Sequence, residues 1–126
     1  MMTRDEQLLY IRPEIATENI TDELMEVFQN KTLRQVLKLQ NDTLLAICLD
    51  FFNNKYKNFE GRDNTIKKSL MQDALKTDQA LKKLLYGVVI GQFTSSELAF
   101  YLNHKSDINK RLVEFIFKRV LGQLIM

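Results

Sequence analysis

The chain holds few of the side chains that perform catalysis or bind metals. Its single His and single Cys are His104 and Cys48, which lie far apart in the sequence, so no base that could activate the thiol is evident. A zinc site needs several His or Cys ligands, and this composition cannot supply them. Nucleotide-binding glycine loops, nucleophile elbows and paired carboxylates are also missing from the sequence. We therefore expect a non-enzymatic chain without a metal or cofactor.

Gln40 is the clearest candidate for ligand binding, because it is a polar side chain on an apolar helical face. At about 100° per residue, it lies near the middle of the apolar arc of a helix expected over residues 32–59. An unbonded amide there costs about 1–3 kcal/mol, so Gln40 either bonds a neighbouring helix or faces a ligand. We favour the structural role. The alternative is a small-ligand or enzymatic pocket near Arg34, Gln40, Asn41 and Tyr86.

Gly87 and Gly91 form a G-x-x-x-G step inside a helix expected over residues 79–93. Two glycines cost a helix about 2 kcal/mol relative to Ala, so a compensating contact is expected. Because side chains are missing there, another helix backbone could approach closely, and we expect such packing at this step. The approach of a flat ligand is the alternative.

A stretch near the C-terminus resembles a helix-turn-helix. A helix over residues 94–103 is followed by a second helix that carries Asn109, Lys110 and Arg111. The resemblance departs from the motif at Asn109, where an apolar residue is expected six positions after the turn. The second helix is also apolar over most of its girth, which leaves a narrow face for a DNA groove. DNA binding through residues 94–112 therefore remains an alternative that we do not favour.

The elements that position these residues are predicted to be helices. Of the 126 residues, 45% are hydrophobic, while only four are Gly and one is Pro, which suits one domain with long uninterrupted helices. No segment shows the sustained polar and apolar alternation of a strand. We expect an all-α fold, a compact bundle of four to six helices with an N-terminal arm.

Capping residues mark where each helix is expected to begin. A short first helix is expected after Thr21, and a long second one from Thr32 to about Phe59. The next three are expected over residues 64–76, from Asp78 to about Phe93 and from Thr94 to about Asn103. The last helix is expected from Ser106 or Asp107 to the C-terminus. Thr94 and Glu97 have the spacing of a capping box, in which the two residues satisfy each other's backbone amides.

The last of these helices carries more apolar surface than one small core needs. Its apolar side chains cover an arc of about 240°, against the roughly 100° stripe of a surface helix. Such a helix is either the central rod of the bundle or is covered by a second copy of the chain. We favour the second copy, because surplus apolar surface is commonly buried by isologous pairing. The expected homodimer interface consists of Val113, Phe117, Val120, Leu121 and Leu124.

Charge divides the chain into an arm and a body. Residues 1–30 hold two basic and seven acidic side chains, a net of −5, and residues 31–126 hold sixteen and nine, a net of +7. We expect residues 1–20 to form an acidic arm packed on a basic body of residues 21–126, with a flexible tail as the alternative. The charged start and the lack of a long apolar run predict a cytoplasmic protein without a membrane partner.

Three stretches of the chain resemble one protein family. They are Arg4–Ile15, Phe28–Arg34 together with Leu37–Asp42, and Ile90–Thr94, and they are similar to a group of short bacterial all-helical proteins that often carry a glyoxalase-related label. Glyoxalase-type folds are βαβββ modules with His and Glu metal ligands, whereas this chain has one His and no strand pattern. The resemblance therefore implies no catalytic residue. It directs attention to side chains that could bind the arm to the body, which are Arg4, Asp5, Arg12, Phe28, Gln29, Asn30, Arg34, Gln40 and Asn41.

Taken together, these patterns predict a non-enzymatic helical-bundle protein in the cytoplasm. We expect it to self-associate through its last helix and to bind another protein. A membrane or nucleic-acid partner is not expected.

Overall fold

The computed structural model describes residues 1–15 and 23–125, and the regular elements of this part of the chain are all helices, without strands. The elements are α1 (Arg4–Ile11), α2 (Leu24–Phe28), the π-helical turn η1 (Gln29–Leu33), α3 (Arg34–Leu39), α4 (Asn41–Lys55), α5 (Asn64–Thr77), α6 (Gln79–Ile90), α7 (Ser95–Asn103) and α8 (Lys105–Leu124). The predicted all-α class is confirmed. Because α2, η1 and α3 follow one another without a break, they form one continuous helix of the bundle, and α1 belongs to the arm.

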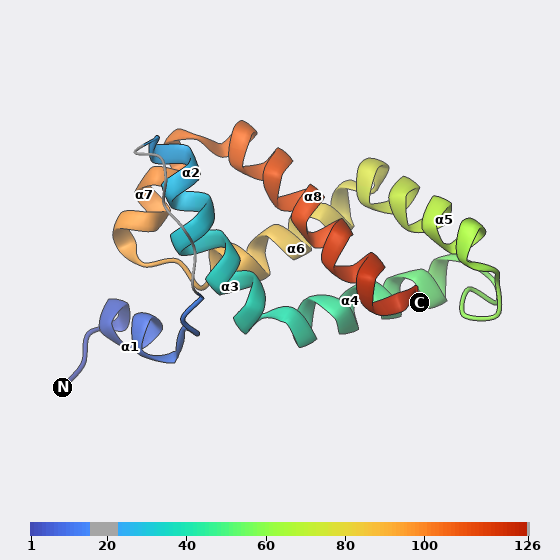
Figure 1. Ribbon diagram of the computed structural model, residues 1–126, viewed down its shortest axis with the longest axis horizontal. Coiled ribbons are helices and arrows are strands. Elements are labelled where there is room, and N and C mark those ends of the chain that lie inside the picture. The colour runs from blue at the N-terminus through green and yellow to red at the C-terminus, as the bar shows by residue number, and fades with distance from the viewer. Residues whose placement is uncertain (16–22, 126) are drawn as a thin grey trace.

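Helix α8 crosses the whole bundle and holds it together (Figure 1). It contacts α4, α5, α6 and α7, and one stripe of its side chains with a spacing of four residues lies in the core. This buried stripe consists of Ile108, Leu112, Ile116 and Val120. The flanking apolar side chains of α8 are partly buried against the same core, so the other helices of the chain cover much of the wide apolar arc.

The long helix expected from Thr32 to about Phe59 is not formed as one piece. The backbone bends at Gln40, where φ is −94° and ψ is 10°, and α4 ends at Lys55. Thr32 is not a cap, because it lies buried in the middle of the continuous helix and its hydroxyl donates to Glu97 Oε2 at 2.8 Å. The expected cap at Thr21 and the expected arm boundary at residue 20 fall outside the described residues.

Two of the predicted caps are confirmed. The carboxylate of Asp78 accepts a hydrogen bond from the amide of Leu81 at 2.9 Å and begins α6. Thr94 and Glu97 form the complete capping box at the start of α7. The last helix begins at Lys105, one residue before Ser106 and two before Asp107, the two expected starts, and His104 is both the C-cap of α7 and the N-cap of α8.

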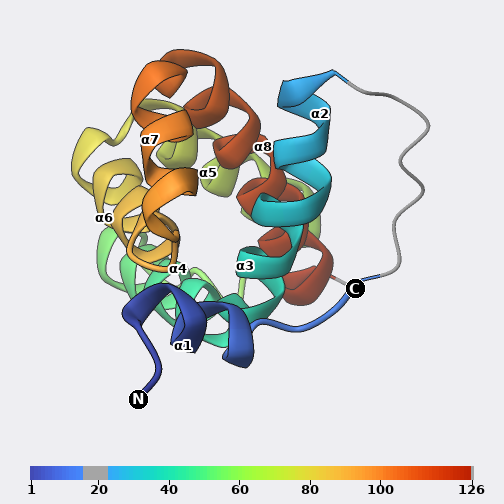
Figure 2. The same ribbon diagram turned by 90° about the vertical axis from the view of Figure 1, so that its left-hand side faces the viewer.

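The described part of the N-terminal arm, residues 1–15, is fixed to the body where α6 ends and α7 begins (Figure 2). Arg4 donates to the carbonyls of Gly91 at 3.2 Å and Phe93 at 3.1 Å. Arg12 donates to the carbonyl of Gln92 at 2.8 Å. These carbonyls follow the C-terminal end of a helix, where unpaired acceptors and the helix dipole favour cations.

The arm also supplies an anion to the neighbouring helix start. Asp5 Oδ1 accepts from the amide of Ser95 at 3.0 Å, at the N-terminal end of α7. The arm was expected to contact the body through its acidic excess, but two arginines and one aspartate make these contacts, with backbone groups and, for Arg12, also with the carboxylate of Glu97. Arg4, Asp5 and Arg12, three of the side chains to which the family resemblance directs attention, make these contacts.

The G-x-x-x-G step does not hold a close helix contact, so this expectation is wrong. Gly87 and Gly91 both lie on the exposed side of α6. A Cβ atom placed on Gly87 would meet no atom within 4 Å, and one on Gly91 would meet the carbonyl oxygen of Gly87 at 3.1 Å. Among the described residues, no other helix occupies the space that the missing side chains leave. No helix in this part of the chain is long and apolar enough to cross a membrane.

Candidate docking groove

The candidate site is a groove of about 560 Å³ between α5, α6 and α8, called here the lysine groove. Its floor is apolar and is made by Leu75 of α5, Tyr86 of α6, and Val113 and Phe117 of α8. Val113 and Phe117 lie four residues apart, so they occupy successive turns on one face of α8. The loop capped by Asp78 turns α5 into α6 and thereby places two of the three walls.

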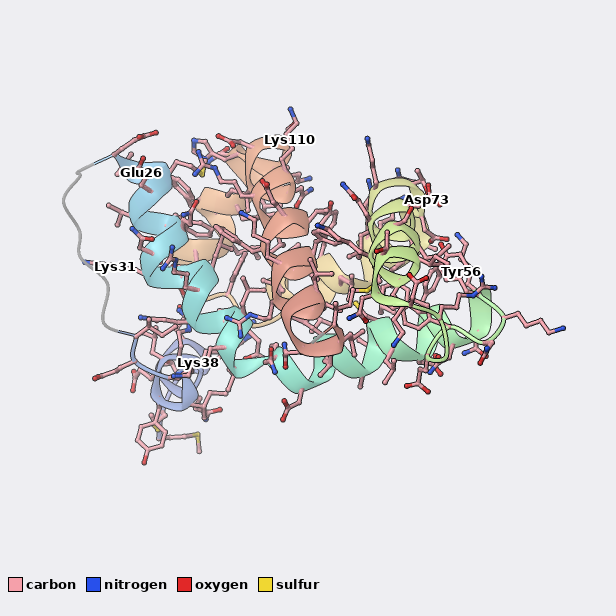
Figure 3. The ribbon with its side chains drawn as sticks, turned by 45° about the vertical axis from the view of Figure 1, so that its right-hand side comes forward. Glu26, Lys31, Lys38, Tyr56, Asp73 and Lys110 are labelled. Atoms are coloured by element: carbon pink, nitrogen blue, oxygen red, sulfur yellow. The ribbon has the colours of Figure 1, made fainter. Side chains whose placement is uncertain are left out.

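Basic side chains from all three helices form the rim of the lysine groove. They are Lys76, Lys82, Lys110 and Lys118. The single carboxylate of the lining is Glu114, which lies 3.9 Å from the ammonium of Lys118 in an exposed pair. Lys82 Nζ donates to the carbonyl of Lys76 at 3.1 Å. The side chain of Lys110 extends away from α8 into solvent (Figure 3), so the rim carries a clear excess of positive charge.

The uncharged polar groups of the lysine groove also offer hydrogen-bond donors. Asn109 Oδ1 accepts from the hydroxyl of Tyr101 at 2.8 Å, which leaves the amide NH2 of Asn109 as a donor toward the groove. Burial, and to a lesser degree Tyr101, raises the pKa of Tyr86, so its phenol stays protonated at neutral pH. A ligand that presents carboxylates above an apolar surface would match both the floor and the rim.

The four residues expected to line a ligand pocket are not brought together. Tyr86 belongs to the lysine groove, whereas Asn41 lines a hollow of about 520 Å³ between α4 and α8. Arg34 lines a third hollow of about 400 Å³ beside Phe115. Asn41 is engaged by Arg119 Nη1 at 3.2 Å and by Gln123 Nε2 at 2.8 Å. Lys118 is the residue that all three hollows share.

Gln40 has a structural partner. Its Nε2 donates to the carbonyl of Val88 at 3.2 Å. In a continuing helix that carbonyl would accept from the amide of Gln92, but Gln92 donates to Val89 instead. Gln40 therefore satisfies a carbonyl left free where α6 ends, which agrees with the structural alternative for this amide.

The five residues expected to form a homodimer interface occupy different environments. Val120 is 1% exposed and lies in the core of its own chain, so it cannot form an interface and leaves the expected set. Val113 and Phe117 form the floor of the lysine groove. Leu121 and Leu124 are partly buried near the end of α8.

The single Cys and the single His contact other groups of their own chain. Burial raises the pKa of the Cys48 thiol to about 12, so almost no thiolate exists at neutral pH. The ring of His104 stacks on Phe100, and its Nδ1 lies 2.9 Å from the carbonyl of Phe100. Among residues 1–15 and 23–125, no group of three or more His, Cys, Asp or Glu side chains could hold a metal ion.

The carboxylate of Glu97 accepts hydrogen bonds from Arg12 of the arm, from Thr32 of η1 and from the amide of Thr94. Burial raises its pKa, but hydrogen bonds from Arg12, from the amide of Thr94 and from Thr32 outweigh burial, so the pKa lies below its ordinary value. Arg12 Nη1 lies 2.6 Å from Oε2, and Nη2 lies 3.0 Å from Oε1. Because both oxygens already accept hydrogen bonds, this carboxylate joins the arm, η1 and α7 and is not available as a general base.

The helix-turn-helix alternative meets a packing difficulty. Its second helix is α8, whose buried stripe faces the core. Arg111 is engaged by Gln29 Oε1 at 2.8 Å and by Asp107 Oδ1 at 3.1 Å. Asn109 accepts from Tyr101. Of the three polar residues expected to contact DNA, only Lys110 is exposed.

Comparisons of the chain with protein-family models, curated proteins and solved structures found no match.

Sequence reasoning did not identify the lysine groove. Lys110, Glu114 and Lys118 are spaced four residues apart, which places them on one face of the last helix, but the sequence pattern drew attention to Lys110 only within the helix-turn-helix alternative. Lys76 and Lys82 come from two other helices, and only the turn between α5 and α6 brings them to the same rim.

Proposed function

We propose that this chain is a non-enzymatic protein-binding module, and that the lysine groove receives an acidic amphipathic helix. The observation that carries the proposal is an apolar floor enclosed by four lysines and a single glutamate. Helix-in-groove recognition uses apolar anchors at positions i, i+3, i+4 and i+7. Carboxylates on the flanks of such a helix would meet the ammonium groups of the rim.

The charges of the groove favour such a segment over an uncharged one. The rim charges are exposed, so each is worth little alone, but together they speed encounter with an acidic partner and fix its register. The apolar floor supplies the remaining free energy, at about 25 cal/mol per Å² of apolar surface removed from water. Binding should therefore weaken, without vanishing, when salt screens the rim.

Self-association forms the second part of this proposal. The apolar flank of α8 that remains partly exposed supports it, since Val113, Phe117, Leu121 and Leu124 are not in the fully buried stripe. A pairing of groove with groove is disfavoured, because it would set the lysines of one copy against those of the other. A homodimer of this chain must therefore place a different surface in the groove or avoid the groove.

A labelled model peptide tests the binding function. The probe is a helical peptide of about 18 residues with Leu at i, i+3, i+4 and i+7 and Glu on its flanks, and the control peptide carries Lys in place of Glu. We expect fluorescence anisotropy to show binding of the acidic peptide only. Reversing two rim charges in the double variant Lys110→Glu/Lys118→Glu should weaken binding about tenfold or more.

The matched control is Lys68→Glu, which reverses an exposed lysine of α5 outside the lysine groove. This variant should bind the acidic peptide as the wild-type chain does. Equal binding of both peptides, or equal weakening by Lys68→Glu, would show that the groove does not select the ligand. Absence of binding to either peptide at concentrations up to about 1 mM would remove the proposed function.

A further inference from the structure

Helix α1 presents an unpartnered apolar face next to a carboxylate. Its contacts with the body use Arg4 and Asp5, together with Arg12 just beyond the helix. None of the residues of α1 is buried. Leu9, one helical turn after Asp5, is 55% exposed, and Tyr10 is 80% exposed.

The outward residues of α1 have the spacing of a groove-binding helix. Glu6, Leu9 and Tyr10 stand at positions i, i+3 and i+4, so they share one face of the helix. Glu6 is exposed, and the described residues contain no ion pair from its carboxylate. This face combines two large apolar side chains with one free negative charge, which is the chemistry that the lysine groove would accept.

The two surfaces cannot meet within one chain. Helix α1 lies at one end of the molecule, and α5, which forms a wall of the lysine groove, lies toward the other end (Figure 1). The hydrogen bonds of Arg4 and Arg12 hold α1 against the junction of α6 and α7. Helix α1 therefore cannot fill the groove of its own chain, and an α1 that occupies the groove belongs to a second copy.

We propose that the outward face of α1 of one copy docks in the lysine groove of another copy, with Leu9 and Tyr10 on the apolar floor and Glu6 against the lysine rim. This inference rests on the proposed function and names the partner of the same groove. The charges support it, because residues 1–15 hold three carboxylates and two arginines, a net of −1, whereas the lining of the groove holds four lysines and one glutamate. Unlike surfaces then meet at each contact, so the association is head-to-tail.

A mixing experiment with two defective variants tests this arrangement. The face variant Leu9→Lys/Tyr10→Lys keeps an intact groove, and the groove variant Lys110→Glu/Lys118→Glu keeps an intact α1. All four positions are exposed, so both variants should fold. Light scattering after size exclusion at about 10 to 200 µM should show wild-type assembly and two monomeric variants. An equimolar mixture should have about twice the monomer mass, because one intact contact is restored.

A matched control keeps the test specific. Leu102→Lys replaces an apolar residue of α7 that is 51% exposed, outside both surfaces, and it should assemble as the wild-type chain does. A monomeric wild-type chain, a face variant that still dimerises, or a mixture that stays monomeric would each overturn the head-to-tail arrangement.

The model peptide separates the two proposals. If the acidic peptide binds the groove while the mixture stays monomeric, the proposed function stands and the second copy is not the occupant. If the peptide does not bind, the proposed function and this inference both fail. Isologous pairing through α8 would predict a different result. The face variant would still form a dimer, and mixing it with the groove variant would not restore a dimer of the groove variant.

Discussion

Arg12 shows how one side chain connects three separate segments of the molecule. Its guanidinium bonds both oxygens of Glu97 and the carbonyl of Gln92, while Glu97 also accepts from Thr32 of η1. The Arg12 side chain is 4% exposed and that of Glu97 is 15% exposed. Each partner is therefore needed to neutralise and hydrogen-bond the other. This holds whether or not the ion pair stabilises the fold more than two apolar side chains would.

Replacing Arg12 by Ala should strongly destabilise the fold. Arg12→Ala leaves a mostly buried carboxylate without its cation, which costs about 3 kcal/mol. Because the folded-state pKa of Glu97 lies below its ordinary value, the stabilisation from this group is present above the unfolded-state pKa of about 4.3. It is lost as the pH falls through the folded-state pKa.

Urea unfolding followed by circular dichroism at pH 7 and at pH 3 measures both effects. The difference in the free energy of unfolding between wild-type and Arg12→Ala should narrow at the lower pH, because Glu97 binds a proton more readily in the unfolded chain than in the folded one. The exposed pair of Lys118 and Glu114 provides the control, since Glu114→Gln should change the free energy of unfolding by less than about 0.5 kcal/mol. A cost for Arg12→Ala no greater than that of Glu114→Gln would contradict the role assigned to Arg12.

At the scale of one helix, α6 carries a glycine that packing does not require. A Cβ atom on Gly87 would enter open space, so Gly87→Ala should stabilise the chain by about 1 kcal/mol through helix propensity. Gly91→Ala is the comparison variant. Its Cβ would lie 3.1 Å from the carbonyl oxygen of Gly87, and this tight contact should remove much of the gain in stability. The melting temperatures of the two variants and the wild-type chain test this prediction. A lower melting temperature for Gly87→Ala would show that another group occupies the space beside Gly87.

The elements also show what the sequence can predict. The caps of α6 and α7 were predictable because Asp78 and the Thr94–Glu97 box act on amides within three residues. Thr32 looked like the same signal, but its hydroxyl bonds a carboxylate 65 positions away, which no local pattern encodes. The lysine groove depends on three helices and was missed for the same reason. The scattered positions of Arg34, Asn41 and Tyr86 likewise depend on tertiary packing.

At the scale of the whole molecule, the arm and the body have unequal packing. Helix α8 places four apolar side chains in the core, whereas α1 has no buried residue and is held by hydrogen bonds of Arg4, Asp5 and Arg12. Segments with few buried apolar contacts open at lower free energy than the core does. Because α1 is also the face proposed to dock on a second copy, its opening should be linked to assembly.

Hydrogen exchange measured by mass spectrometry should reveal this inequality. In a dilute sample, amides of α1 should exchange about a hundredfold faster than those of α8, with α7 as the neighbouring comparison because it lies beside α1 and contributes Tyr101 to the core. Raising the protein concentration should slow exchange in α1 and around the lysine groove while leaving α7 unchanged, since docking hides only the first two surfaces. Equal protection of α1 and α8 in the dilute sample would mean that the polar contacts of the arm hold it as firmly as apolar packing holds the core.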